Sequence, residues 1–231
     1  MRTTAIHCAL ALACAAAAPA VASVTPVFQN VYNNGFFTPF NASTPSTVRY
    51  GDSGWFGNGA SSPAELCDIT LGLVMFGSTS NGTTDITFTF NDGDPSGLVF
   101  GSGATLYSTT IHNVALPDAS EAGGSAAFNL TIPLPGVVTS GGFNNIGWSI
   151  GVSNFSSNGS LGFQCSNGFS QPLGFYTNNA SFNNGSGWSL FSFGSDPITG
   201  VANFVATVTV PAPASVGLIG VAALAGLRRR R

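Results

Sequence analysis

Alternation of apolar and polar side chains between residues 23 and 209 is the feature that most constrains the fold. The stretch DITFTFN (85–91) places one isoleucine and two phenylalanines on one side and two threonines on the other. A period of two belongs to β-strands, whose successive side chains point to opposite faces of a sheet. Residues 128–134 and 146–152 repeat the pattern. We therefore predict half-buried strands in all three segments.

Other strand candidates are short and alternate with turn sequences rich in Gly, Asn, Asp and Ser, such as NDGDPSG and NNGSG. Residues 24–46, with five aromatic residues and three prolines, are less regular and are interpreted as an N-terminal strand with a long connection. No part of the body shows the period of an amphipathic helix. We predict further strands at 66–76, 98–100, 105–111, 163–165, 188–193 and 202–210.

Short strands that are apolar on one side bury that side by packing two sheets face to face. We predict an all-β fold for residues 23–209, a single antiparallel β-sandwich of jelly-roll-like topology. A single closed barrel is the alternative.

The first 22 residues have the three parts of a secretory signal peptide. Arg2 is followed by an apolar run at about 8–18 and by the small-residue triplet Ala20-Val21-Ala22, which predicts cleavage after Ala22. An uncleaved anchor is disfavoured because the run is shorter than the ~20 residues that cross a bilayer. A lipid attached at Cys14 is a further alternative, although Ala11 occupies the place where a lipobox has leucine. We expect export.

The last 22 residues, 210–231, form a second segment with three parts. Two prolines flank Ala212, an apolar run covers 216–227, and the chain finishes with Arg228, Arg229, Arg230 and Arg231. As a helix, 216–227 would rise about 18 Å, against ~30 Å of hydrocarbon, so we interpret it as a transient anchor. The arginines would remain cytoplasmic under the positive-inside rule and leave the body outside.

This tail resembles the PEP-CTERM sorting signal of exported Gram-negative bacterial proteins. The resemblance covers the last 22 residues, with Pro211-Ala212-Pro213 in place of Pro-Glu-Pro. It implies that an exosortase, a membrane-embedded enzyme, removes the tail. The body would then reach the cell surface or the extracellular polysaccharide matrix of a biofilm. The alternative is a plain C-terminal membrane anchor with a basic stop-transfer cluster.

Charge excludes nucleic acid as a partner. Between the two terminal segments the chain has no lysine, one arginine (Arg49) and nine acidic residues. Affinity for nucleic acid depends mainly on Lys and Arg, so an acidic body of this kind does not follow a phosphate backbone.

Four cysteines are present, of which two lie in the signal peptide. The pair that remains, Cys67 and Cys165, predicts a disulfide in an exported protein. Closing so long a loop would stabilise the fold by up to about 4.7 kcal/mol in the chain-entropy model. The alternative is two separate buried thiols.

One stretch resembles half of a calcium loop. Asp92, Asp94 and Ser96 alternate before Gly97, so that their oxygens are able to converge on one hard cation. Gly103 stands where the closing glutamate would be, and the flanking segments are predicted strands. An Asp-Gly turn explains the same residues by turn chemistry alone. No other cofactor is predicted.

No catalytic residues are predicted. Once the signal peptide is removed, His112 is the only imidazole, with Asp118 and Glu121 nearby in sequence. A zinc site or a catalytic triad needs more partners. A glycosidase needs two carboxylates at a defined separation, which the sequence does not identify. We interpret His112 as polar surface, and a secreted hydrolase is the least favoured class.

Aromatic residues near Gly, Asn and Ser suggest sugar stacking, although most aromatic side chains serve packing. We expect an exported, surface-sorted, non-enzymatic protein that associates with extracellular polysaccharide. The alternative function is a carbohydrate-binding module with an aromatic platform. The residues considered for that platform are Trp55, Phe56, Phe169, Phe175, Tyr176 and Trp188.

Overall fold

The computed structural model describes residues 23–31, 35–57, 59, 62–166, 173–177, 179–193 and 202–212. Within these residues the chain forms fourteen antiparallel strands in two sheets and no helix. The first sheet contains β1 (Val24–Asn30), β2 (Gly35–Phe40), β4 (Asp68–Phe76), β7 (Ser125–Pro133), β9 (Ser160–Ser166), β13 (Asn203–Phe204) and β14 (Ala206–Pro211). The second contains β3 (Arg49–Trp55), β5 (Gly82–Gly93), β6 (Gly101–Leu116), β8 (Asn145–Ser153), β10 (Phe175–Tyr176), β11 (Ala180–Asn183) and β12 (Trp188–Phe191).

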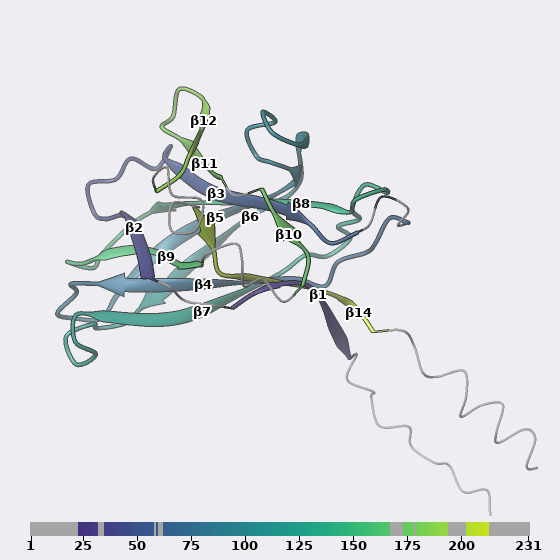
Figure 1. Cartoon of the computed structure of the whole chain (residues 1–231). Coiled ribbons are helices and arrows are strands. Elements are labelled where there is room, and N and C mark those ends of the chain that lie inside the picture. Colours follow the sequence, from purple (N-terminus) through teal and green to yellow (C-terminus); the bar gives the residue numbers. More distant parts are fainter. Residues whose placement is uncertain are drawn as a thin grey trace, which may run out of the picture.

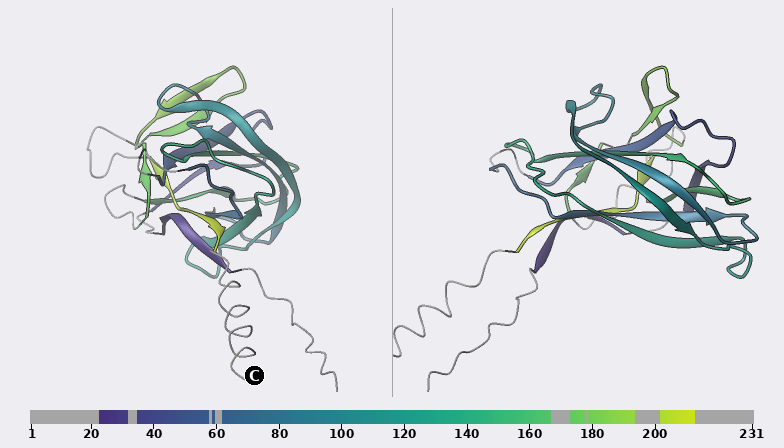
Figure 2. Two further views of the ribbon diagram at one scale, coloured as in Figure 1. Left: turned by 90° about the vertical axis from the view of Figure 1, so that its right-hand side faces the viewer. Right: turned by 180° about the vertical axis from the view of Figure 1, so that it is seen from behind.

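The first sheet has the order β1-β14-β4-β9-β13, with β7 also paired to β4 and β2 to β9. The second has the order β12-β11-β3-β8-β5-β6, with β10 also paired to β3. Figures 1 and 2 show the two sheets as separate layers. The fold is therefore a β-sandwich.

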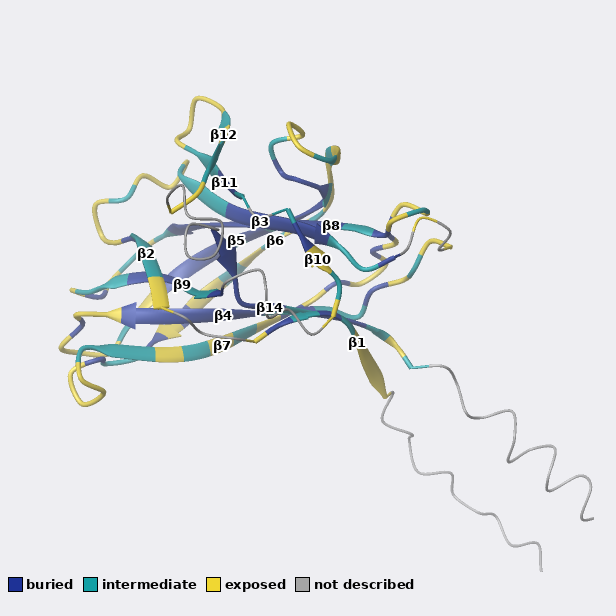
Figure 3. Ribbon diagram, viewed as in Figure 1, coloured by how far each residue is buried: buried dark blue, intermediate teal, exposed yellow. Residues whose placement is uncertain are grey.

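Aromatic side chains from both sheets fill the space between the layers. Trp148 of β8 contacts Phe163 of β9 at 5.7 Å between ring centroids, and Phe163 stacks on Phe204 at 4.2 Å. All three are almost completely buried, and Figure 3 shows the inner strands as the buried part of the molecule. Because aromatic rings bury large apolar areas, the contacts of Trp148 with Phe163 and Phe204 help to hold the two sheets together.

The alternating patterns predict the inward faces correctly. Ile86, Phe88 and Phe90 are fully buried, whereas Thr87 and Thr89 lie on the outer face, where they pair with hydroxyls of β6. The all-β prediction and the two antiparallel sheets are confirmed. The single barrel is not observed among the described residues.

The strand prediction did not include β3, β10 or β11, and two further details of it are wrong. Residues 98–100 belong to the connection between β5 and β6 and form no strand there. In addition, β8 is buried on both faces: Gly147, Ser149 and Gly151 of its outer face are buried as well. This strand lies in the middle of its sheet, and Arg49 passes over it to donate to the Thr87 carbonyl oxygen at 3.3 Å.

The ends of the described chain leave the sandwich side by side. Val24 pairs with Pro211, and the amide of Ala212 donates to the Ser23 carbonyl oxygen at 2.8 Å. Strand β14 thus includes the first proline of the predicted sorting motif. The predicted signal peptide (1–22) and the apolar run with its arginines (216–231) lie outside the described residues. Across the described ranges, no helix is long and apolar enough to cross a membrane.

Candidate functional site

The connection between β5 and β6, residues 94–100, is organised by the buried carboxylate of Asp94. Its Oδ1 accepts from the Ser96 amide at 3.0 Å, and its Oδ2 accepts from the amides of Leu98 and Val99 at 3.2 Å each. The hydroxyls of Ser96 and of Ser181 in β11 also donate to it. Asp94 therefore fixes the shape of this loop and attaches it to β11.

The two carboxylates of the predicted calcium loop are occupied by protein donors. Asp92 accepts from the Ser102 hydroxyl at 2.7 Å and from the side-chain amide (Nδ2) of Asn145 at 3.4 Å. Asp94 accepts five hydrogen bonds, as above. The described part of the chain holds no group of three or more His, Cys, Asp or Glu placed to bind a metal ion. Asp92 and Gly93 are the last two residues of β5 and do not form a hairpin turn, and calcium binding at Asp92, Asp94 and Ser96 stays a prediction.

Trp55, at the end of β3, is the centre of a cluster of aromatic rings. Phe175 of β10 stacks against it with centroids 5.6 Å apart and an interplanar angle of 22°. Phe100 and Phe143 meet it edge-on at 5.2 and 6.4 Å. We call Trp55, Val99, Phe100, Phe143 and Phe175 the aromatic patch. It borders an open pocket of about 330 Å³, whose lining is Trp55, Val99, Phe100, Phe143, Tyr176 and Thr177.

Polar atoms at this pocket are bonded to the fold. The hydroxyl of Tyr176 donates to the Phe204 carbonyl oxygen, and the Thr177 hydroxyl lies 3.1 Å from that of Ser53. Burial, followed by the nearby Asp52, raises the pKa of Tyr176 well above its usual value, so this phenol stays neutral. The pocket therefore offers aromatic faces and few free hydrogen-bonding groups.

The structure brings together three of the six aromatic residues predicted as a platform: Trp55, Phe175 and Tyr176. Phe56 packs against the core, and Trp188 begins β12, where it pairs with Asn183. Phe169 lies outside the described residues.

Sequence reasoning missed Val99, Phe100 and Phe143. Val99 and Phe100 were assigned to a strand, and Phe143 was not singled out. Its place in the sequence SGGFNN, an aromatic residue between turn residues, is the signal that could have indicated an exposed ring.

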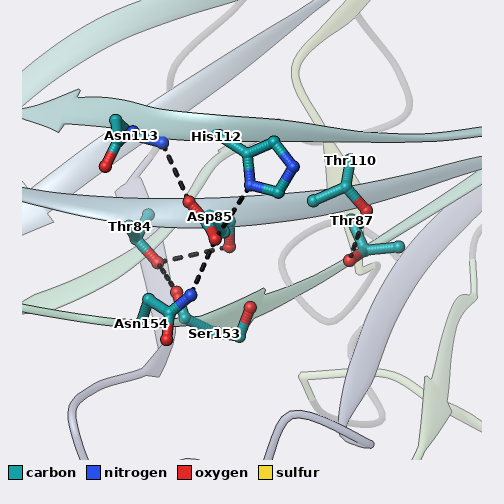
Figure 4. A network of polar contacts seen from close by, with 8 residues as sticks. All are labelled: Thr84, Asp85, Thr87, Thr110, His112, Asn113, Ser153 and Asn154. Atoms are coloured by element: carbon teal, nitrogen blue, oxygen red, sulfur yellow. Dashed lines mark hydrogen bonds and ion pairs between the residues drawn. The ribbon is translucent and has the colours of Figure 1, made fainter.

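His112, predicted as isolated polar surface, takes part in a network on the outer face of the second sheet (Figure 4). Its Nδ1 lies 3.0 Å from Oδ2 of Asp85, the partner that the sequence did not indicate. Asp85 also accepts from the Asn113 amide at 2.8 Å and from the side-chain amide of Asn154 at 2.7 Å. These hydrogen bonds lower the pKa of Asp85 to about 2, with the Asn113 amide as the largest cause. The network joins β5, β6 and the end of β8.

Replacing Asp85 with asparagine should make stability less sensitive to acid. The folded-state pKa of Asp85 lies below the unfolded value of ~3.9, so its stabilising effect is present above about pH 4 and is lost as the pH falls towards 2. Thermal unfolding of wild type and Asp85→Asn at pH 5 and pH 2.5 measures this. The variant should lose less on acidification, with exposed Glu121→Gln as the control. An equal loss in both proteins would refute the assignment.

Cys67 and Cys165 are both free thiols, so the predicted disulfide is not formed in this structure. Cys165 lies in β9 opposite Gly35 and Phe204, whereas Cys67 precedes β4 and bonds through its backbone to Thr209 and Leu134. The two cysteines are therefore paired with different parts of the first sheet. Burial, together with Asp52, raises the pKa of Cys165 to about 12, so that thiol is protonated at neutral pH.

Comparison with known protein families and with curated proteins finds no match. Two solved structures show a weak similarity, both from infectious bursal disease virus. A chain of the T13 particle shares 14% identity at a TM-score of 0.24, and covers 83% of this chain and 40% of its own. A chain of the Gt strain shares 16% identity at a TM-score of 0.23, with coverages of 84% and 43%. This protein thus spans less than half of those chains, and such scores support no inference about its function.

Proposed function

We propose that the chain is an exported, surface-sorted, non-enzymatic protein that associates with extracellular polysaccharide. Its tail would hold it transiently in the inner membrane until an exosortase-type enzyme releases the body to the cell surface or matrix. We also propose a jelly-roll-like strand order for the sandwich. The proposal rests on the two sequence signals and on one structural observation.

That observation is the position of the chain ends. β1 begins at Val24 and β14 finishes at Pro211, and the two strands pair with each other. The expected cleavage sites, after Ala22 and near Pro211–Pro213, therefore flank the sandwich. Both terminal segments are removable without cutting through the core strands, as a sorted protein requires.

The C-terminal peptide of surface-derived protein, identified by mass spectrometry in the native host, tests this proposal. We expect mature protein without Arg228–Arg231. Replacing these arginines with serine, or deleting 216–227, should leave the protein unprocessed or misrouted, because the basic cluster keeps the cut site on the outer side. Ala212→Glu, which restores Pro-Glu-Pro, should be processed at least as well. Recovery of intact GLRRRR from the surface would reject processing and indicate a plain anchor.

The carbohydrate-binding module is the second candidate, because exposed Phe175 stacks on half-buried Trp55 and offers a ring face suited to a sugar. A glycan array probed with residues 23–212 tests it. A defined glycan should be retained, and Trp55→Ala should weaken retention about tenfold, since stacking of this kind contributes roughly 1–1.5 kcal/mol. Trp188→Ala, at the β11-β12 hairpin, is the matched control. Unchanged retention in Trp55→Ala would exclude the patch as the sugar site.

A further inference from the structure

Large apolar side chains of the aromatic patch and of its loop are exposed to solvent and lie outside the core. Phe143 is 55% exposed and Phe175 58%, and Leu98, in the loop that contributes Val99 and Phe100, is 66% exposed. Scattered apolar residues are normal on a protein surface, whereas exposed apolar side chains that adjoin one another are typical of interaction sites.

Strand β10, which carries Phe175 of this patch, lies beside β1, one of the two strands at which the chain leaves the sandwich. Phe28 of β1 packs on Tyr176 at 4.8 Å between ring centroids, and the amide of Gln29 donates to the Leu173 carbonyl oxygen at 3.1 Å. Figure 1 shows β10 close to β1. Val24, paired with Pro211, precedes Phe28 by four extended residues, which is about 13 Å.

The tail allows little separation between this end of the sandwich and a membrane. Three residues, 213–215, separate Ala212, bonded to Ser23, from residue 216, where the apolar run begins, so four Cα–Cα steps join the two positions. Fully extended, they span at most about 14 Å. A body tethered so closely has the end that carries β1, β14 and the aromatic patch at the lipid surface.

We propose that the aromatic patch docks on the outer surface of the bilayer in which the tail is inserted, with zwitterionic phospholipid as its partner. This inference rests on the anchoring step of the proposed function. Trp and Phe suit the membrane interface because an apolar ring enters the acyl boundary. The only basic residue of the body, Arg49, begins β3, and Trp55 ends it, so recognition is apolar and does not use phosphate charge. The inward-bonded hydroxyls of Tyr176 and Thr177 favour lipid over sugar.

The test uses the chain from residue 23 to 231, with Trp188→Phe, in phosphatidylcholine vesicles with or without brominated acyl chains. Trp148 is buried, so quenching reports on Trp55. Bromine should lower the emission of Trp55 about twofold, as expected for a side chain that reaches the acyl boundary. The double variant Phe143→Ser/Phe175→Ser should lose this quenching and still float with the vesicles through its tail. Phe36 and Phe76 are a second pair of exposed rings, with centroids 5.2 Å apart, and the control variant Phe36→Ser/Phe76→Ser should keep the quenching of Trp55.

Each outcome separates docking from anchoring. Protein that fails to float with vesicles would reject the anchor and the docking that depends on it. Flotation without quenching of Trp55 would overturn docking alone and leave the anchor intact. Quenching that survives in the Phe143/Phe175 variant would remove the patch as the contact. A change in Trp55 emission caused by soluble polysaccharide, with no quenching by lipid, would assign the patch to sugar instead.

Discussion

Replacing Gly147 with alanine should lower the free energy of unfolding by about 3 kcal/mol, at the upper end of overpacking effects. Gly147 lies in β8, and β5 bends over it where Gly93 adopts a φ of +79°. A Cβ at Gly147 would overlap the Gly93 carbonyl oxygen and lie 2.6 Å from its carbon. Both groups are backbone, so no side-chain rotation relieves the contact. The strand pair must separate, and the loop that Asp94 organises must move with it.

Urea unfolding, followed by the fluorescence of buried Trp148, measures this loss. Gly187→Ala is the matched control, since a Cβ there meets no atom within 4 Å. Because the displaced loop carries Val99 and Phe100, Gly147→Ala should also alter the environment of Trp55. A Gly147→Ala variant as stable as Gly187→Ala would show that the Gly93 carbonyl does not lie over Gly147 as described.

The period-two pattern was sufficient to predict the layers of this fold. Each inward residue of DITFTFN is buried because a strand alternates its side chains whatever its neighbours are. The same rule could not predict that β8 is buried on both faces. That depends on its central place in the sheet and on the side chain of Arg49, both set by contacts distant in sequence.

Prediction of the site was less complete for the same reason. Trp55 and Phe175 are 120 residues apart and meet because β10 pairs with β3. His112 is linked to Asp85 only through the register of β5 and β6. For Cys67 and Cys165 the sequence predicted a bond that this structure does not contain. An even count suggested a disulfide, but bonding requires Cα atoms within about 7 Å, which depends on strand order.

A buried carboxylate in β3, Asp52, was not singled out by the sequence. It is fully buried and accepts from the amides of Phe204 and Ser53 at 2.8 Å each. The Phe204 bond connects the two sheets. Burial is the largest influence on the pKa of Asp52 and raises it well above the usual value; the two amides oppose this, and Asp94 adds to it. Arg49, the one lysine or arginine among residues 23–212 that the structure describes, does not compensate the charge, because it is directed to Thr87.

Asp52→Ala should lower the free energy of unfolding by about 3 kcal/mol, because it leaves the buried amide of Phe204 without its acceptor and opens a cavity between the sheets.

Asp52→Asn should lower the free energy of unfolding by less and should also change how that free energy depends on pH. In the wild type the folded-state pKa exceeds the unfolded value of ~3.9, so the native state holds the proton more strongly and stability falls as the pH rises through the raised pKa. The asparagine variant has no proton to lose at this position and should show a flatter profile. Urea unfolding between pH 4 and 8 measures both effects, with exposed Glu121→Ala within about 0.5 kcal/mol of wild type. A profile for Asp52→Asn parallel to that of the wild type would mean that Asp52 does not titrate in this range and that its two amide bonds, not burial, determine its charge.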